Sequence, residues 1–109
     1  MLTRDDLTDE EDHALHSLMD GTSGDMLVEQ EFLLAFLTGL RVFKERQKKY
    51  GRANIARAGA AGVVIRLGDK LSRLERQSEV TDESVNDTWI DVSNYNFIRL
   101  MAENGRWPK

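Results

Sequence analysis

The most informative part of the chain is residues 83–95, which read Glu-Ser-Val-Asn-Asp-Thr-Trp-Ile-Asp-Val-Ser-Asn-Tyr. At 3.6 residues per turn, four of its polar residues fall within roughly 80° of one another on a helix. These residues are Glu83, Asp87, Asp91 and Asn94. The same face becomes apolar towards Ile98. Carboxylates beside an aliphatic stripe repel each other and lose hydration, so they need a cation between them. With oxygen ligands alone, we expect Mg²⁺ or Mn²⁺.

An ordinary solvated helix face is the competing interpretation of this stretch. Glu83 and Asp87 would lie in the first turn, where acids interact favourably with the helix dipole. That interpretation does not account for Asp91 and Asn94, which lie in mid-helix beside aliphatic residues. Both interpretations stay open, and the metal site is the one that predicts a function.

Outside this stretch, apolar residues recur at helical spacing along most of the chain. The helix that contains the stretch is expected at 82–103, and two further long helices at 25–49 and 53–77. A short helix is expected at 8–20, with Thr8 as its N-cap. No strand pattern interrupts these segments. The predicted fold class is an all-α helical bundle of three long helices plus a short N-terminal helix.

The last helix carries a second apolar face, which a chain of 109 residues cannot easily cover by itself. Its residues are Val85, Trp89, Val92 and Leu100. Only two other long helices are available, so we expect dimerisation to complete the bundle, in a homodimer or homotetramer. We assign residues 1–24 to an acidic N-terminal segment and residues 25–105 to the helical domain.

Charge is distributed unevenly along the chain, although the net charge is only −4. Residues 1–31 hold ten acids and one base, whereas residues 41–76 hold eleven bases and three acids. The two segments could neutralise each other, or the basic segment could line a binding site for phosphates. We expect a phosphate-bearing small ligand, and no direct nucleic-acid binding.

Composition excludes several classes of site. There is no cysteine, hence no disulfide framework, thiol nucleophile or cysteine zinc site. The two histidines, His13 and His16, lie i,i+3 among acids, which suits a solvated acidic helix better than a surface metal site. A Ser-His-Asp triad has no other histidine to use. No apolar run reaches the length of a membrane span and no signal peptide is visible, so we expect the cytoplasm.

Basic residues surround Asp69 in the second long helix. By spacing, this carboxylate could simply pair with Arg66 or Arg73, at i−3 and i+4. Alternatively it could be a fourth oxygen ligand for the metal, with Arg66, Lys70 and Arg73 ready to bind a polyphosphate.

Lys48-Lys49-Tyr50-Gly51 ends the first long helix. Lysines there suit the helix dipole, and Gly51 suits the first position after the helix. A functional interpretation is also open, because the Tyr50 ring can stack on a base while Lys49 reaches a phosphate.

Three motifs, in order, resemble the nucleotide modification associated domain of phages and bacteria. They are Lys49-Tyr50-Gly51, then Ile65-Arg-Leu-Gly-Asp-Lys-Leu-Ser-Arg-Leu74, then Glu83-Ser-Val-x-Asp-Thr-x-x-Asp-x-x-Asn-Tyr95. The resemblance covers roughly residues 44–100. That family looks like a branch of the MazG-like all-α nucleoside triphosphate pyrophosphohydrolases. The resemblance therefore implies a MazG-like bundle in the cytoplasm of a bacterium or a phage-infected cell.

The resemblance also implies an activity, the Mg²⁺-dependent hydrolysis of a nucleoside triphosphate, ribo or deoxyribo, to the monophosphate and pyrophosphate. Carried onto this chain, the metal ligands are Asp69, Glu83, Asp87 and Asp91, and Glu83 and Asp87 are the catalytic residues. Where the family has several glutamates on the first ligand helix, this chain has Asp69 nearly alone.

The residues expected to bind the nucleotide substrate are Lys49, Tyr50, Arg66, Lys70, Arg73 and Asn94. The main alternative is a non-catalytic nucleotide-binding or regulatory helical module with a degenerate metal site. A third reading is a structural phage protein whose acidic N-terminus docks a basic partner.

Overall fold

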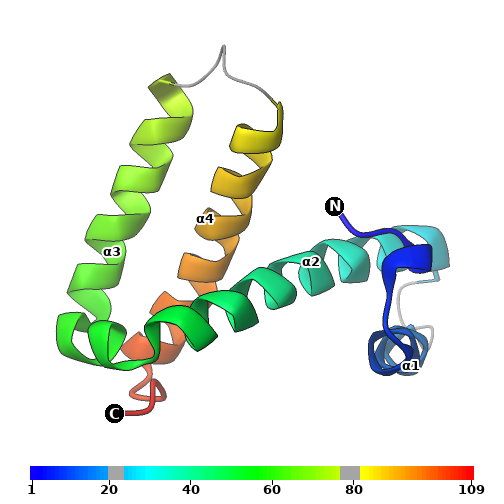
Figure 1. Ribbon diagram of the computed structural model, residues 1–109, viewed down its shortest axis with the longest axis horizontal. Coiled ribbons are helices and arrows are strands. Elements are labelled where there is room, and N and C mark those ends of the chain that lie inside the picture. The colour runs from blue at the N-terminus through cyan, green and yellow to red at the C-terminus, as the bar shows by residue number, and fades with distance from the viewer. Residues whose placement is uncertain (20–23, 77–81) are drawn as a thin grey trace. The chain divides into compact units, whose positions relative to one another are not determined.

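The computed structural model describes residues 1–19, 24–76 and 82–109, with the backbone alone at 82–85. Within these ranges the chain is helical and no strand occurs, which confirms the all-α prediction (Figure 1). The elements are the 3₁₀ turn η1 (Arg4–Asp6) and the helices α1 (Asp9–Leu18), α2 (Met26–Tyr50), α3 (Ala53–Arg76) and α4 (Asp82–Glu103). Two compact units result, Met1–Arg41 and Val42–Lys109, and α2 contributes to both. The division predicted at residue 24 stays a prediction.

In the N-terminal unit, α1 begins where the sequence predicts. The Thr8 hydroxyl accepts a hydrogen bond from the Glu11 N–H at 3.2 Å, and the Glu11 carboxylate accepts one from the Thr8 N–H at 2.9 Å. This reciprocal pair satisfies two backbone donors at the start of the helix. Leu15 of α1 and Leu34 and Leu37 of α2 are buried. These leucines form the apolar part of the unit.

Arg41 of α2 pairs with Glu11 of α1. The Arg41 Nε donates to Glu11 Oε2 at 2.8 Å, and Arg41 Nη2 donates to the Asp6 carbonyl at 2.6 Å. The hydrogen bonds from Arg41, with those from Thr8, lower the pKa of the Glu11 carboxyl from 4.5 to about 2. The guanidinium therefore ties η1, α1 and α2 together.

His16 lies in the same unit, and both of its ring nitrogens have partners. Nδ1 lies 2.8 Å from the Asp12 carbonyl oxygen and Nε2 lies 3.0 Å from Arg4 Nη2. The arginine can only donate, so this geometry assigns the ring proton to Nδ1. These partners accord with a histidine on a solvated acidic helix.

In the C-terminal unit, α2 ends as the sequence predicts. Gly51 has φ +68°, a conformation that favours glycine, and its N–H donates to the Gln47 carbonyl at 2.8 Å. Gly51 and Arg52 connect α2 to α3.

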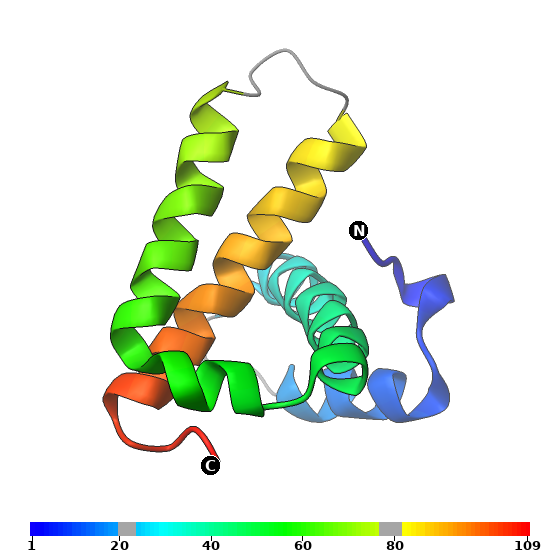
Figure 2. The same cartoon turned by 60° about the vertical axis from the view of Figure 1, so that its left-hand side comes forward.

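Helix α3 contains a sharp kink that the sequence did not predict. At Gly59 the backbone has φ +68° and ψ −174°, a region available essentially to glycine alone. The first turns of α3 consequently run in a different direction from the rest of the helix (Figure 2). This kink brings Asn54 and Ile55 back against the remainder of the unit.

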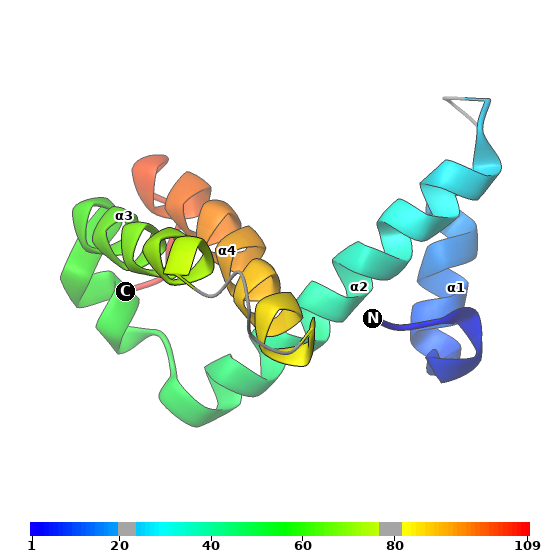
Figure 3. The same ribbon diagram turned by 90° about the horizontal axis from the view of Figure 1, so that it is seen from above.

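Helices α3 and α4 form an antiparallel pair, side by side in Figures 1 and 3. Val63 and Ile98 are buried in a cluster with Ile55, and Phe43, Tyr95 and Trp107 pack against it. Helix α4 ends at Glu103, and just beyond it Gly105 has φ +67° while the Arg106 N–H donates to the Met101 carbonyl at 2.8 Å. The Trp107 indole N–H donates to the Arg52 carbonyl at 3.0 Å, which holds the C-terminal residues against the start of α3.

The predicted second apolar face of α4 is partly buried and partly exposed. Val92 is buried, whereas the Trp89 and Leu100 side chains are exposed to 53 % and 59 %. Val85 lies outside the residues whose side chains are described. Dimerisation across this face stays a prediction. Over the described residues, no helix is long and apolar enough to cross a membrane.

Candidate functional site

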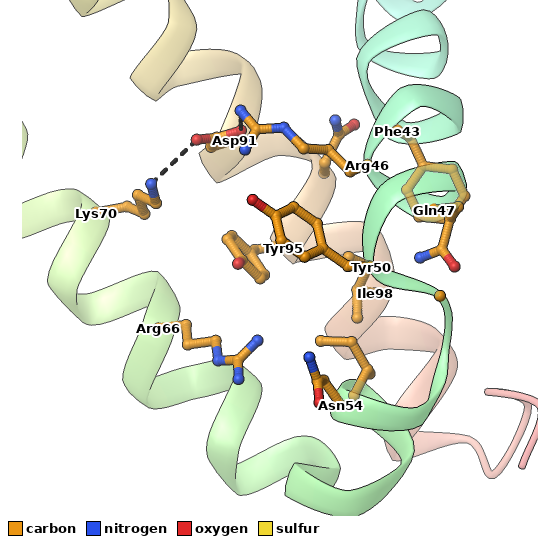
Figure 4. Close-up of a pocket in the computed structure, with 13 residues that line it drawn as sticks. Phe43, Arg46, Gln47, Tyr50, Asn54, Arg66, Lys70, Asp91, Tyr95 and Ile98 are labelled. Carbon is orange, nitrogen blue, oxygen red and sulfur yellow. Dashed lines mark hydrogen bonds and ion pairs between the residues drawn. The ribbon is translucent and has the colours of Figure 1, made fainter.

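A pocket of about 300 Å³ lies within the C-terminal unit, between the end of α2, two stretches of α3 and the middle of α4 (Figure 4). That volume lies at the lower end of the range for ligand sites, roughly 300–1,000 Å³. The lining residues are Phe43, Arg46, Gln47, Tyr50, Gly51, Asn54, Ile55, Arg66, Lys70, Asp91, Asn94, Tyr95 and Ile98.

Helical periodicity explains how these side chains gather. On α2 they lie at positions 43, 46, 47 and 50, and on α4 at positions 91, 94, 95 and 98. Both sets follow the i, i+3, i+4, i+7 spacing of a single helix face. Arg66 and Lys70 are spaced i,i+4 on α3. The remaining wall consists of Gly51, in the turn after α2, and of Asn54 and Ile55, which precede the kink at Gly59.

Among the residues whose side chains the structure describes, Asp91 is the only carboxylate in the pocket lining, and it pairs with two of the three cations there. Its Oδ2 lies 3.1 Å from the Lys70 ammonium and its Oδ1 lies 3.4 Å from the Arg46 guanidinium. The Asp91 side chain is 14 % exposed and Lys70 is 25 % exposed. This half-buried cluster links α2, α3 and α4 and fixes two positive groups at the pocket wall.

Arg66 is the third cation, and its environment is different. Its guanidinium points into the pocket, towards Asn54 (Figure 4). No hydrogen bond or ion pair joins its side chain to any residue whose side chain the structure describes, in 1–19, 24–76 and 86–109. It is half-buried, so part of its hydration is lost, and none of those residues replaces it. Such a group is suited to binding an anion from solution.

Two tyrosine rings lie between these polar groups in Figure 4. Tyr50 is largely exposed, and the Lys49 ammonium sits 5.3 Å from its ring centroid. Tyr95 is partly buried, because one side of it packs on the core cluster. Aromatic faces beside a cationic wall suit a ligand with both a planar ring and an anionic group.

Four of the six residues predicted to bind substrate lie together in this pocket, namely Tyr50, Arg66, Lys70 and Asn94. Lys49 and Arg73 are exposed and outside the lining. Lys49 still borders the pocket through its contact with the Tyr50 ring.

The predicted metal ligands are placed less closely together. Asp91 lines the pocket, whereas Asp69 and Asp87 are exposed and outside its lining. The Glu83 side chain lies outside the described residues. Within the described part of the chain, no group of three His, Cys, Asp or Glu residues could hold a metal ion. Oxygen donors suit Mg²⁺, but it would have to replace Lys70 and Arg46 at Asp91, and the metal site stays a prediction.

The sequence did not predict four of the lining residues, which are Phe43, Arg46, Gln47 and Asn54. A signal for the first three was present, because they precede Tyr50 at i−7, i−4 and i−3, on the same helix face. Asn54 carried no such signal, since its position depends on the kink at Gly59.

Comparison with known proteins found no matching family model, curated protein or solved structure. The resemblance to the nucleotide modification associated domain therefore stays a prediction.

Proposed function

We propose that the protein binds a nucleotide in the pocket of its C-terminal unit. The observation that carries this proposal is the combination, in one lining, of two tyrosine rings with three cations. The unit as a whole favours an anionic ligand, because residues 42–109 hold thirteen bases and nine acids.

Each part of a nucleotide has a chemical counterpart in the lining. A base can stack on the exposed Tyr50 ring, and a phosphate can accept hydrogen bonds from the Arg66 guanidinium. The amides of Asn54 and Asn94 both donate and accept, so they suit the hydroxyls of a sugar or the edge of a base.

Titration calorimetry with a panel of ribo- and deoxyribonucleotides tests the proposal. Tyr50→Ala should weaken binding about tenfold, since stacking on an aromatic ring contributes roughly 1–3 kcal/mol per base. Arg66→Ala should weaken it by a similar factor. Arg57→Ala is the matched control, because Arg57 is an exposed cation on α3 outside the lining. Absence of heat with every nucleotide at millimolar concentration would contradict the proposal.

Hydrolysis of a nucleoside triphosphate to monophosphate and pyrophosphate is a second candidate function. It is favoured by the position of Asp91 in the lining, with Asp87 one turn earlier on the same face of α4. A bound Mg²⁺ would supply charge neutralisation and an activated water beside these carboxylates.

Pyrophosphate release with and without Mg²⁺ separates the two candidates. If the chain is an enzyme, Glu83→Gln and Asp87→Asn should lower kcat more than they raise KM, and Lys70→Ala should do the reverse. A wild-type protein that binds nucleotide and releases no pyrophosphate with any metal would leave the binding module as its function.

A further inference from the structure

The net charge of the pocket lining matches a single phosphate group. Among the described residues of the lining, three cations, Arg46, Arg66 and Lys70, face one carboxylate, Asp91, which leaves a net charge of +2. A phosphate monoester carries about −1.5 to −2 at neutral pH. One such group neutralises the lining, whereas a diphosphate or triphosphate brings negative charge that the lining cannot balance.

The ion pairs between these charges also favour a ligand with a single phosphate group. Asp91 forms ion pairs with Lys70 at 3.1 Å and with Arg46 at 3.4 Å. Among the described cations of the lining, only Arg66 therefore has a guanidinium without an ion-pair or hydrogen-bond partner. Asp91 is half-buried and faces the pocket, where it repels any further phosphate more strongly than an exposed carboxylate would. A volume of about 300 Å³ also favours a small ligand.

We propose that the pocket selects a nucleoside monophosphate over the corresponding diphosphate and triphosphate when no divalent metal is present. The phosphate lies at Arg66 and the base at Tyr50, and Asp91 is the specificity-determining residue that disfavours longer phosphate chains. This inference rests on the proposed nucleotide-binding function.

Calorimetry in EDTA tests the inference with the mono-, di- and triphosphates of the four common ribonucleosides. EDTA is needed because Mg²⁺ would mask the charge of the longer chains. We expect at least one monophosphate to bind about tenfold more tightly than its triphosphate. Ribose 5-phosphate and inorganic phosphate should bind at least about fivefold more weakly than that monophosphate, because they lack the base that stacks on Tyr50.

Paired variants identify the role of Asp91. Asp91→Asn removes the negative charge and should reduce the preference for the monophosphate to less than about threefold. Glu45→Gln removes a carboxylate next to Arg46 in the chain, exposed and outside the lining, and should keep the wild-type preference. Circular dichroism verifies that both variants are folded, and the wild-type series stands without them.

The outcomes are distinguishable. If nucleotides bind and the triphosphate is as tight as the monophosphate in EDTA, this inference is overturned and the proposed function survives. If no nucleotide binds, both are overturned. If inorganic phosphate binds as tightly as the monophosphate, the selection of a nucleoside is overturned.

Discussion

At the scale of single residues, Asp91 contributes to the C-terminal unit as well as to its pocket. Its ion pairs with Lys70 and Arg46 join three helices. We expect Asp91→Ala to lower the free energy of unfolding by about 1–2 kcal/mol, between the values typical of exposed and buried pairs. Urea denaturation measures the change. Asp87→Ala, at an exposed site, should change it by less than about 0.5 kcal/mol, and equal effects of the two variants would contradict this assignment.

Glu11 predicts an acid-sensitive contact in the N-terminal unit. Its pKa is about 2 in the folded state against an ordinary 4.5, because Arg41 and then Thr8 hydrogen-bond to the ionised carboxylate. Between these pH values the unfolded chain binds more protons, so stability falls as the pH drops. The contribution is complete above about pH 5 and is lost towards pH 2.

Hydrogen exchange of the α1 amides measures this loss. Protection in the wild type should fall as the pH is lowered from 5 to 2, after correction for the intrinsic exchange rate. Glu11→Gln should show a flatter profile, and Glu10→Gln, at an exposed neighbouring site, should keep the wild-type one. Identical profiles for all three proteins would show that the Glu11–Arg41 pair does not stabilise the folded state.

At the scale of elements, two of the three glycines of α3 make opposite predictions. Gly59 has φ +68° in a region closed to other residues, so Gly59→Ala should destabilise by about 1–3 kcal/mol. The same change should weaken nucleotide binding, since the kink places Asn54 in the pocket. Gly68 lies in the helix interior with open space at its Cβ position, so Gly68→Ala should stabilise by about 0.4–1 kcal/mol. Thermal melting of the two variants decides this, and a stabilised Gly59→Ala protein would contradict the kink.

The helices could be predicted from sequence because their signals are local. Thr8 as a cap, Gly51 after α2 and the start of α4 at residue 82 all agree with the structure. The kink at Gly59 could not be predicted, because Ala-Gly-Ala-Ala-Gly at 58–62 keeps its small residues compatible with a straight helix. A single φ value, set by packing on the core, changes the direction of the chain there.

The candidate site could be predicted in part, because some of its signals are also local. Arg66 and Lys70 share a helix face by spacing, and Tyr50 is marked by the end of α2. The pairing of Asp91 with Lys70 and Arg46 depends on how three helices pack, which no local pattern contains. The sequence predicted a divalent metal ion near Asp91, and it did not predict that Lys70 and Arg46 pair with that carboxylate.

At the scale of the whole molecule, the exposed apolar face that includes Trp89 of α4 and Val64 of α3 predicts self-association. On α4, Trp89 lies about 200° from Asp91, and on α3, Val64 lies about 200° from Arg66. Both therefore point away from the pocket, and both are exposed. We propose that a second copy covers this face, as in a four-helix arrangement.

Light scattering after size exclusion measures the assembly. The wild type should be a dimer at micromolar concentration, and Trp89→Asp should yield a folded monomer, since Trp89 is 53 % exposed within one chain. Ser17→Asp adds the same charge at an exposed site on α1, in the N-terminal unit, and should leave the dimer intact. A wild-type monomer would contradict this prediction without affecting the pocket.

The most direct test of nucleotide binding is an NMR titration of the ¹⁵N-labelled protein with the tightest nucleotide in the panel. We predict that the largest shifts arise in the side-chain amides of Asn54 and Asn94 and in the Arg66 Nε–H, with the rest of the pocket lining following. Residues 1–19 should shift little. A titration without shifts at millimolar nucleotide, or with its largest shifts in residues 1–19, would contradict a nucleotide site in this pocket.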